Sequence, residues 1–160
     1  MKIGVISDTH SYGPTDALIR VARGAFSEVS LILHAGDLTC MSVLDVFSDK
    51  KVISVCGNKD RSLVADFLPE KQILHINGYR IGLVHGWGRP KGIEERVVQC
   101  FTDVHCIVYG HTHRPKNCIH NGLLLFNPGS FSGTRFLKRH PTAGILTIED
   151  GISGRIFPVE

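Results

Sequence analysis

Histidine and acidic residues placed directly after short apolar segments are the residues of this chain that could do chemistry. The polar groups read Asp8-Thr9-His10, Gly36-Asp37, Gly57-Asn58-Lys59-Asp60, His85-Gly86 and Gly110-His111-Thr112-His113. Imidazole nitrogens and carboxylate or amide oxygens are metal ligands. The candidate ligands are Asp8, His10, Asp37, Asn58, His85, His111 and His113. Four imidazoles beside two carboxylates favour manganese, iron, nickel or zinc over calcium or magnesium alone.

The number of these side chains suits two divalent cations. Two such ions need about ten to twelve ligand positions, some filled by water and one by a shared carboxylate. In the Asp8-x-His10 and His111-x-His113 spacings, an extended backbone would place both side chains on the same side of the chain. Each pair could then serve one cation or two neighbouring ones.

The elements that must position these ligands begin with three apolar strands, expected at 2–7, 30–35 and 51–56. A helix capped by Thr15 should face inward with its apolar residues, which are Leu18, Val21, Ala22 and Ala25. A shorter helix is expected at Met41–Phe47, with Leu44 and Phe47 inward. This β-α-β-α-β order predicts parallel strands, whose carboxyl ends meet at one edge of the sheet.

The second half of the chain predicts hairpins. Asn-Gly turns at 77–78 and 121–122 each separate two apolar runs, 73–76 from 79–84 and 118–120 from 123–126. A helix should follow Pro90, with Ile93, Val97, Val98 and Phe101 on one face, before a strand at 104–109. Segments 143–148 and 152–159 form a last predicted hairpin. An α/β fold extended by antiparallel strands is therefore expected.

Length and composition limit the function classes. The 160 residues, 42% hydrophobic and 21% charged, fit one domain spanning residues 1–160. Five cysteines without a C-x-x-C pair argue against a disulfide framework or zinc knuckle and favour a cytoplasmic protein. The first apolar run is too short for a membrane span or signal-peptide core. A net charge of +3 without a basic run does not favour a nucleic-acid partner.

The ordered ligand set, D-x-H, G-D, G-N, a histidine after a strand and G-H-x-H, resembles the calcineurin-like metallophosphoesterase superfamily from residue 4 to about residue 130. The length without inserts, together with Gly110–Pro115 and Asn127–Ser130, is most similar to the small YfcE-type phosphodiesterase branch. The resemblance implies a four-layer α-β-β-α sandwich with two metal ions at one edge. It also implies hydrolysis of a small phosphodiester by a hydroxide held between the two ions.

The resemblance further implies a division of the ligands. One ion would be held by Asp8, His10, Asp37 and His113, and the other by Asp37, Asn58, His85 and His111. Asp37 would then be the bridge, and manganese is the expected metal, with nickel, iron or zinc as alternatives. Asn58 would also help to neutralise the charge on the phosphate. Larger phosphatases of the superfamily carry a histidine after the asparagine, which protonates the leaving oxygen, whereas this chain has Lys59. Protonation is left to Asp60 or to metal-bound water, and hydrolysis of monoesters with a poor leaving group is disfavoured.

Several residues around the expected site have alternative explanations. Arg114 and Lys59 could bind substrate phosphate or simply face solvent. Asn127–Ser130 could support a ligand or form a plain turn. Trp87 could line a pocket or pack, and the other histidines, at 34, 75, 105, 120 and 140, are interpreted as structural or exposed.

Two rival functions use the same fold, a non-catalytic scaffold, as in the retromer subunit of the superfamily, and a nuclease. Filled ligand positions disfavour the scaffold. The absence of an added domain or basic track disfavours the nuclease. The sequence leaves open whether the chain forms a homo-oligomer.

Overall fold

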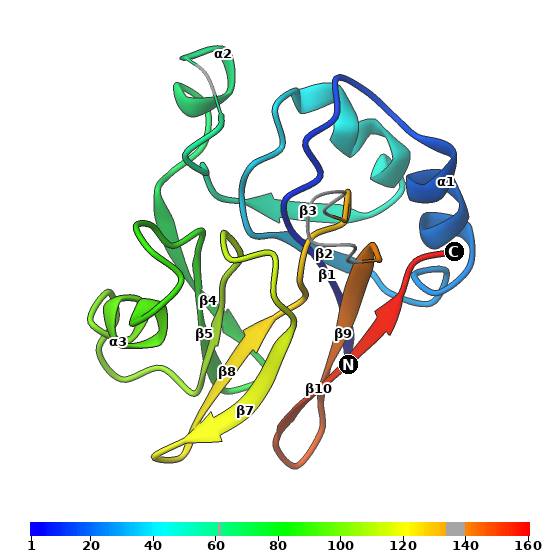
Figure 1. Ribbon diagram of the computed structural model, residues 1–160. Coiled ribbons are helices and arrows are strands. Elements are labelled where there is room, and N and C mark those ends of the chain that lie inside the picture. The colour runs from blue at the N-terminus through cyan, green and yellow to red at the C-terminus, as the bar shows by residue number, and fades with distance from the viewer. Residues whose placement is uncertain (61, 134–139) are drawn as a thin grey trace.

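The computed structural model describes residues 1–60, 62–133 and 140–160 (Figure 1). Its first-half elements are β1 (Lys2–Ile6), α1 (Asp16–Arg23), β2 (Leu31–His34), the 3₁₀-helix η1 (Met41–Phe47), β3 (Lys51–Ser54) and α2 (Ser62–Ala65). The second half contains β4 (Lys71–Ile76), β5 (Tyr79–Val84), α3 (Ile93–Val98), β6 (Cys106–Val108), β7 (Lys116–His120), β8 (Leu123–Asn127), β9 (Thr142–Ile148) and β10 (Ile152–Pro158).

Two five-stranded sheets form the centre of the fold, in the orders β10-β9-β1-β2-β3 and β4-β5-β6-β8-β7. The predicted parallel arrangement is confirmed for β1, β2 and β3. The second sheet also has a parallel centre, because β6 pairs in parallel with β5 and β8. The Asn-Gly hairpins are confirmed as the antiparallel pairs β4–β5 and β7–β8, and the last hairpin as β9–β10.

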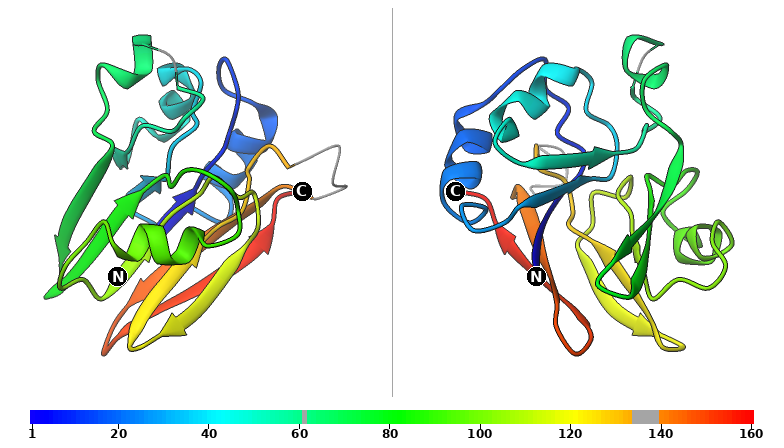
Figure 2. Two further views of the ribbon diagram at one scale, coloured as in Figure 1. Left: turned by 60° about the vertical axis from the view of Figure 1, so that its left-hand side comes forward. Right: turned by 180° about the vertical axis from the view of Figure 1, so that it is seen from behind.

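Side chains alternate between the two faces of each strand, and their packing gives the fold four layers. Ile3 and Val5 of β1 point into the core between the two sheets, whereas Ile6 packs with α1 and η1 on the outer face. In the second sheet Val108 points into the central core and Ile107 packs with α3 on the opposite outer face. Figures 1 and 2 show α1 and α3 on opposite sides of the paired sheets. The expected α-β-β-α sandwich is therefore confirmed.

The first two helices differ in detail from the prediction. Thr15 caps α1 as expected, its side chain accepting a hydrogen bond from the Leu18 backbone, but the helix ends at Arg23. Ala25 therefore lies beyond the helix and is exposed, and Phe26 fills the core instead. In η1 the buried residues are Val43 and Phe47, whereas Leu44 is half-buried. The reason is packing, since Val43 and Phe47 join the cluster formed by Phe26 and α1.

The helix and strand after Pro90 are shorter than predicted. α3 ends at Val98, because the backbone N–H groups of Cys100 and Phe101 bond three residues back and tighten the chain into turns. Phe101 thus packs from outside the helix, next to Gly82. β6 contains only the three residues that pair with both β5 and β8.

The loops after the parallel strands lie together along one edge of the sandwich, and α2 projects from this region at the top of Figure 1. Backbone hydrogen bonds join these loops: the Asp8 N–H donates to the Gly36 carbonyl at 3.0 Å, and the Gly110 N–H to the His85 carbonyl at 3.1 Å. Within the described ranges, no helix is long and apolar enough to cross a bilayer.

Candidate metal centre

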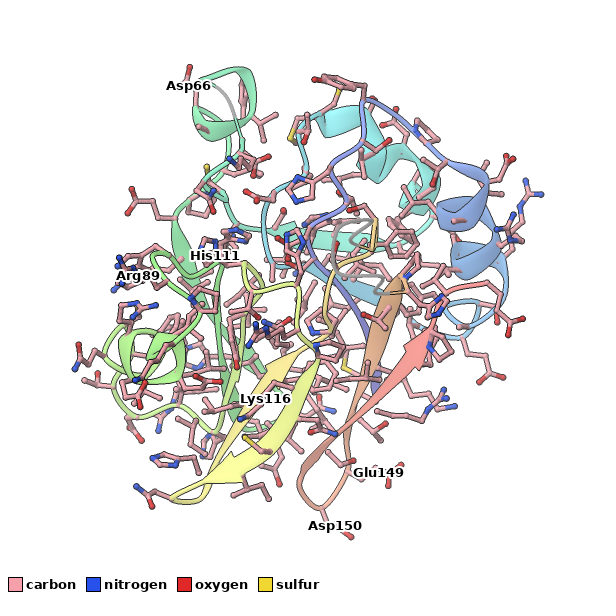
Figure 3. The ribbon with its side chains drawn as sticks, in the orientation of Figure 1. Asp66, Arg89, His111, Lys116, Glu149 and Asp150 are labelled. Atoms are coloured by element: carbon pink, nitrogen blue, oxygen red, sulfur yellow. The ribbon has the colours of Figure 1, made fainter. Side chains whose placement is uncertain are left out.

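The candidate ligands come from loops of both sheets. Asp8 and His10 follow β1, Asp37 follows β2, His85 follows β5, and the His111–His113 segment follows β6. A hydrogen bond connects the loops of the two sheets at Asp8, whose Oδ2 accepts the backbone N–H of His111 at 3.1 Å. In Figure 3 His111 lies on a loop above α3, near the labelled Arg89.

The backbone at these ligands is left-handed rather than extended, so the expected extended geometry is wrong. The φ values are 54° at Asp8, 44° at His10, 57° at Asp37, 67° at His111 and 55° at His113. Such conformations cost about 1–3 kcal/mol each and persist only where surrounding contacts enforce them. The tight turns aim the side chains at one region instead of along a strand.

Each carboxylate has one oxygen held in place and one that faces imidazoles. Asp8 Oδ2 accepts the Ser7 hydroxyl at 2.6 Å. Asp8 Oδ1 is buried, accepts no hydrogen bond from the described part of the chain, and lies 3.1 Å from His113 Nε2. Asp37 Oδ1 accepts the Lys59 backbone N–H at 2.7 Å, and Asp37 Oδ2 lies 3.4 Å from His85 Nε2. A cation would satisfy the inward-facing oxygens.

Two histidines have ring orientations suited to metal binding. His85 Nδ1 lies 2.6 Å from the Ala35 carbonyl and His111 Nε2 lies 2.8 Å from the Gly88 carbonyl, so each of these nitrogens donates its proton. The other nitrogen of each ring then carries the lone pair. These nitrogens, His85 Nε2 and His111 Nδ1, lie 3.1 and 2.8 Å from Asn58 Oδ1. Backbone carbonyls commonly fix the tautomer of metal-binding histidines in this way.

The charges in the centre are mutually stabilised. Burial opposes ionisation of Asp37, but contacts with His85 and the Lys59 N–H outweigh it and lower the pKa of Asp37. Burial also lowers the pKa of His10, against the opposing effect of the Asp8 and Asp37 carboxylates. At His85 burial is outweighed by Asp37 and Asp8, and its pKa is raised. The proton that His85 takes up is one that a metal ion must displace.

The inward-facing atoms form two overlapping groups, each with its ligand atoms within 4.8 Å of one another. The first contains Asp8, His10 and His113, and the second contains Asp8, Asp37 and His85. Asp37 Oδ2 also lies between the groups, 3.7 Å from His10 Nε2 and 3.4 Å from His85 Nε2. Both carboxylates therefore reach both groups, and the residues fit two neighbouring divalent cations. The bridging role of Asp37 stays a prediction.

Glycine is required where the loops approach most closely. A Cβ on Gly57 would lie 2.2 Å from Asp37 Oδ1, and a Cβ on Gly110 would lie 1.9 Å from Ser7 Oγ and 2.7 Å from Asp8 Oδ2. Backbone and ligand carboxylate could not both keep their places around a larger residue. These two glycines therefore allow the loops to lie close enough together to form the centre.

Asp60 and Lys59 occupy different positions at the centre. The Asp60 carboxylate accepts three backbone N–H groups, those of Asp37 at 3.0 Å, Thr39 at 2.7 Å and Gly57 at 2.8 Å. This arrangement ties the loop after β2 to the loop after β3, and it favours an anchoring role over proton transfer. Lys59 is exposed, with its backbone fixed by Asp37.

The remaining predicted residues mostly support the loops. Asn127 Nδ2 donates to the Gly110 carbonyl at 2.8 Å, and the Ser130 hydroxyl donates to the Asp8 carbonyl at 3.1 Å. Arg114 lines a separate hollow of about 240 Å³ with Tyr109. A role for Arg114 in binding phosphate stays a prediction. Sequence reasoning missed the hydrogen bond from Ser7 to Asp8 and the carbonyl partners of the histidines, because neither leaves a motif.

His34 supports the centre from behind. It is fully buried, its Nδ1 accepts the Gly36 N–H at 3.2 Å, and its Nε2 lies 3.1 Å from the Thr9 hydroxyl, to which it donates. Burial lowers the pKa of His34 to about 3. The histidine is therefore neutral in the folded chain, which agrees with the structural role expected for it.

Acid should destabilise the chain through His34. The unfolded chain binds a proton there below about pH 6.5 and the folded chain does not, so this stability is complete above pH 6.5 and is lost as the pH falls. Between pH 6.5 and 5 the loss should reach about 1.5 kcal/mol. Urea unfolding at several pH values, with chelator present, should show that the free energy of unfolding depends less on pH in His34→Gln than in wild type. The same dependence of unfolding free energy on pH in both proteins would contradict the conclusion that His34 is neutral in the folded chain.

This fold and this centre define a class of protein, and comparison with known sequences identifies the class. A family model of the calcineurin-like phosphoesterase superfamily domain matches residues 1–151. A probable metallophosphoesterase of Methanocaldococcus jannaschii is 37% identical over 166 residues, covering 100% of this chain and 82% of the relative. The chain belongs to the calcineurin-like phosphoesterase superfamily, as the motif resemblance implied.

One further relative and one solved structure support the same assignment, and a second solved structure shares the fold. A phosphodiesterase of M. jannaschii is 29% identical over 168 residues, covering 93% of this chain and 94% of the relative. The solved structure of an archaeal phosphodiesterase is 26% identical with a TM-score of 0.79, covering 99% of this chain and 100% of that one. Vps29 of Entamoeba histolytica, solved with zinc, shares the fold at 23% identity and a TM-score of 0.74, with 99% of each chain covered.

Proposed function

We propose that this chain is a phosphodiesterase that uses two divalent transition-metal ions, with manganese as the expected metal. The observation that carries the proposal is the convergence of Asp8 Oδ1 and Asp37 Oδ2 on imidazole nitrogens, with no hydrogen bond to Asp8 Oδ1 from the described residues. When bound, the ions would supply a hydroxide at neutral pH and neutralise the phosphate oxygens. The archaeal relatives named as phosphodiesterases support the choice of substrate.

The residues of the chain then have separate tasks. Asp8 and Asp37, together with the four histidines and Asn58, would hold the two ions. Asp60 holds the loops of Asp37 and Gly57 together through its backbone contacts. Water attacks phosphorus as the bond to one ester oxygen breaks, giving a phosphate monoester and an alcohol. Since Asp60 is engaged by backbone N–H groups, the leaving oxygen takes its proton from solvent.

The scaffold function is less well supported than catalysis. The likeness to Vps29 shows the fold alone, at 23% identity. A scaffold does not need strained backbone at metal ligands, whereas this chain holds both carboxylates and three of its histidines in left-handed conformations.

The residue after Asn58 tests the preference for diesters. We expect wild type to hydrolyse bis(p-nitrophenyl) phosphate faster than p-nitrophenyl phosphate, because Lys59 replaces a histidine proton donor. Lys59→His should raise the monoester rate relative to the diester rate by about 10-fold or more, a small part of the roughly 100- to 10,000-fold that a positioned general acid typically contributes. The exposed side chain makes the change compatible with folding.

Lys59→Gln is the matched control, since it removes the charge without adding a proton donor. Steady-state rates on both esters for the three proteins give the ratio. A ratio that is the same in Lys59→His and Lys59→Gln would show that the histidine does not determine the preference.

A further inference from the structure

A hollow of about 460 Å³ lies beside the metal centre. Asn58 and His85 line it on one side, and Val84, Trp87 and Cys100 line it elsewhere. Its size lies within the range of about 300–1,000 Å³ that is typical of small-molecule sites. Because two candidate ligands form part of its wall, a group attached to a phosphate at the centre can extend into it.

The walls of the hollow are mainly uncharged, with Glu70 and Lys71 as the acidic and basic residues among those that line it. Val84 is buried, and the thiols of Cys56 and Cys100 donate to the carbonyls of Gly57 and Arg96. The Lys71 ammonium at the rim is engaged by the Cys100 carbonyl at 2.9 Å. Such a surface disfavours a second phosphate and favours a flat group of low polarity.

The Trp87 side chain is accessible to such a group, and its backbone is held in position. It is the only tryptophan of the chain and is 48% exposed. Arg96 Nε donates to the Trp87 carbonyl at 3.0 Å, Arg96 Nη1 donates to the Lys91 carbonyl at 3.3 Å, and Arg96 Nη2 donates to the Arg89 carbonyl. The same loop accepts the His111 ring N–H at the Gly88 carbonyl. The backbone of Trp87 and a candidate metal ligand, His111, are thus held by one loop.

We infer that this hollow is the subsite for one ester substituent of the substrate, and that it takes an uncharged aromatic ring, aryl or nucleobase, against Trp87. The inference rests on the proposed phosphodiesterase function and specifies its substrate as a diester with at least one ring-bearing substituent. Trp87 is then a specificity-determining residue that contacts substrate without taking part in the chemical step.

Three phosphodiesters test the subsite in the manganese-loaded protein: diphenyl phosphate, thymidine 5′-(methyl phosphate) and dimethyl phosphate. Their inhibition constants against bis(p-nitrophenyl) phosphate give affinity, and quenching of the single tryptophan reports contact directly. Stacking on an aromatic side chain should make a ring-bearing diester bind roughly 5- to 160-fold more tightly than dimethyl phosphate. Trp87→Ala should abolish this preference, and Trp87→Phe should retain most of it.

Phe67→Ala is the matched control, since Phe67 is an aromatic residue that is 76% exposed and does not line the hollow. It should keep the ring preference. Preference for diphenyl phosphate alone would identify an aryl substituent, and preference for the thymidine ester alone a nucleobase. A ring preference that survives Trp87→Ala, or quenching equal for all three esters, would overturn the inference. Diester hydrolysis itself would then stand, whereas no turnover of any diester would refute the proposed function.

Discussion

Asp37→Asn should reduce phosphodiester turnover by about 1000-fold, because loss of one supporting contact around a metal typically costs 10- to 100-fold and a shared ligand should cost more. Asp37 Oδ2 lies within 3.7 Å of an imidazole nitrogen in each group of candidate ligands. The amide preserves the shape but removes the charge that offsets the repulsion between two cations. Both ions should therefore bind more weakly.

The matched control is Asp45→Asn, which makes the same chemical change at an exposed position on η1. It should retain wild-type turnover. His10→Gln and Asn58→Asp should be less damaging than Asp37→Asn, since each alters a ligand expected to serve one ion. Elemental analysis, diester rates and thermal melts distinguish the cases. An Asp37→Asn protein that keeps two tightly bound ions and near-normal turnover would transfer the bridging role to Asp8, which also belongs to both groups.

The sequence carried enough information to predict most of the fold, because buried strands and Asn-Gly turns leave local patterns. The hairpins form around the predicted Asn-Gly turns at 77–78 and 121–122, with Ile76 opposite Tyr79 and His120 opposite Leu123. Helix ends were less predictable. Ala25 and Phe101 continue the apolar periodicity of their helices, yet both helices stop earlier, because tertiary packing rather than periodicity determines where a short helix ends.

The candidate ligands could be proposed from the sequence because they follow strands in order. Their backbone conformation could not, since the left-handed φ of Asp8 and His10 depends on contacts with loops far along the chain. The role of Arg96 in holding the loop that carries Trp87 could not be predicted either. It acts through hydrogen bonds to backbone carbonyls, which have no sequence signature.

Removing metal should have an effect as large as that of Asp37→Asn. Polarisation of phosphate by bound cations contributes several kcal/mol, and each 1.36 kcal/mol is a factor of ten, so chelated protein should lose at least about 1000-fold in diester turnover. The fold should survive, because its strands are held by apolar clusters between and outside the sheets. A thermal melt of the chelated protein checks this point.

The most direct test of the account is to titrate manganese into chelated protein while measuring hydrolysis of bis(p-nitrophenyl) phosphate and metal content together. Since Asp8 and Asp37 each reach both groups of candidate ligands, turnover should rise until two ions are bound per chain and then stay constant. Asp45→Asn should follow the same curve, and Asp37→Asn should not. Full turnover by folded protein that contains no metal, or a plateau at one ion per chain, would contradict the two-metal centre.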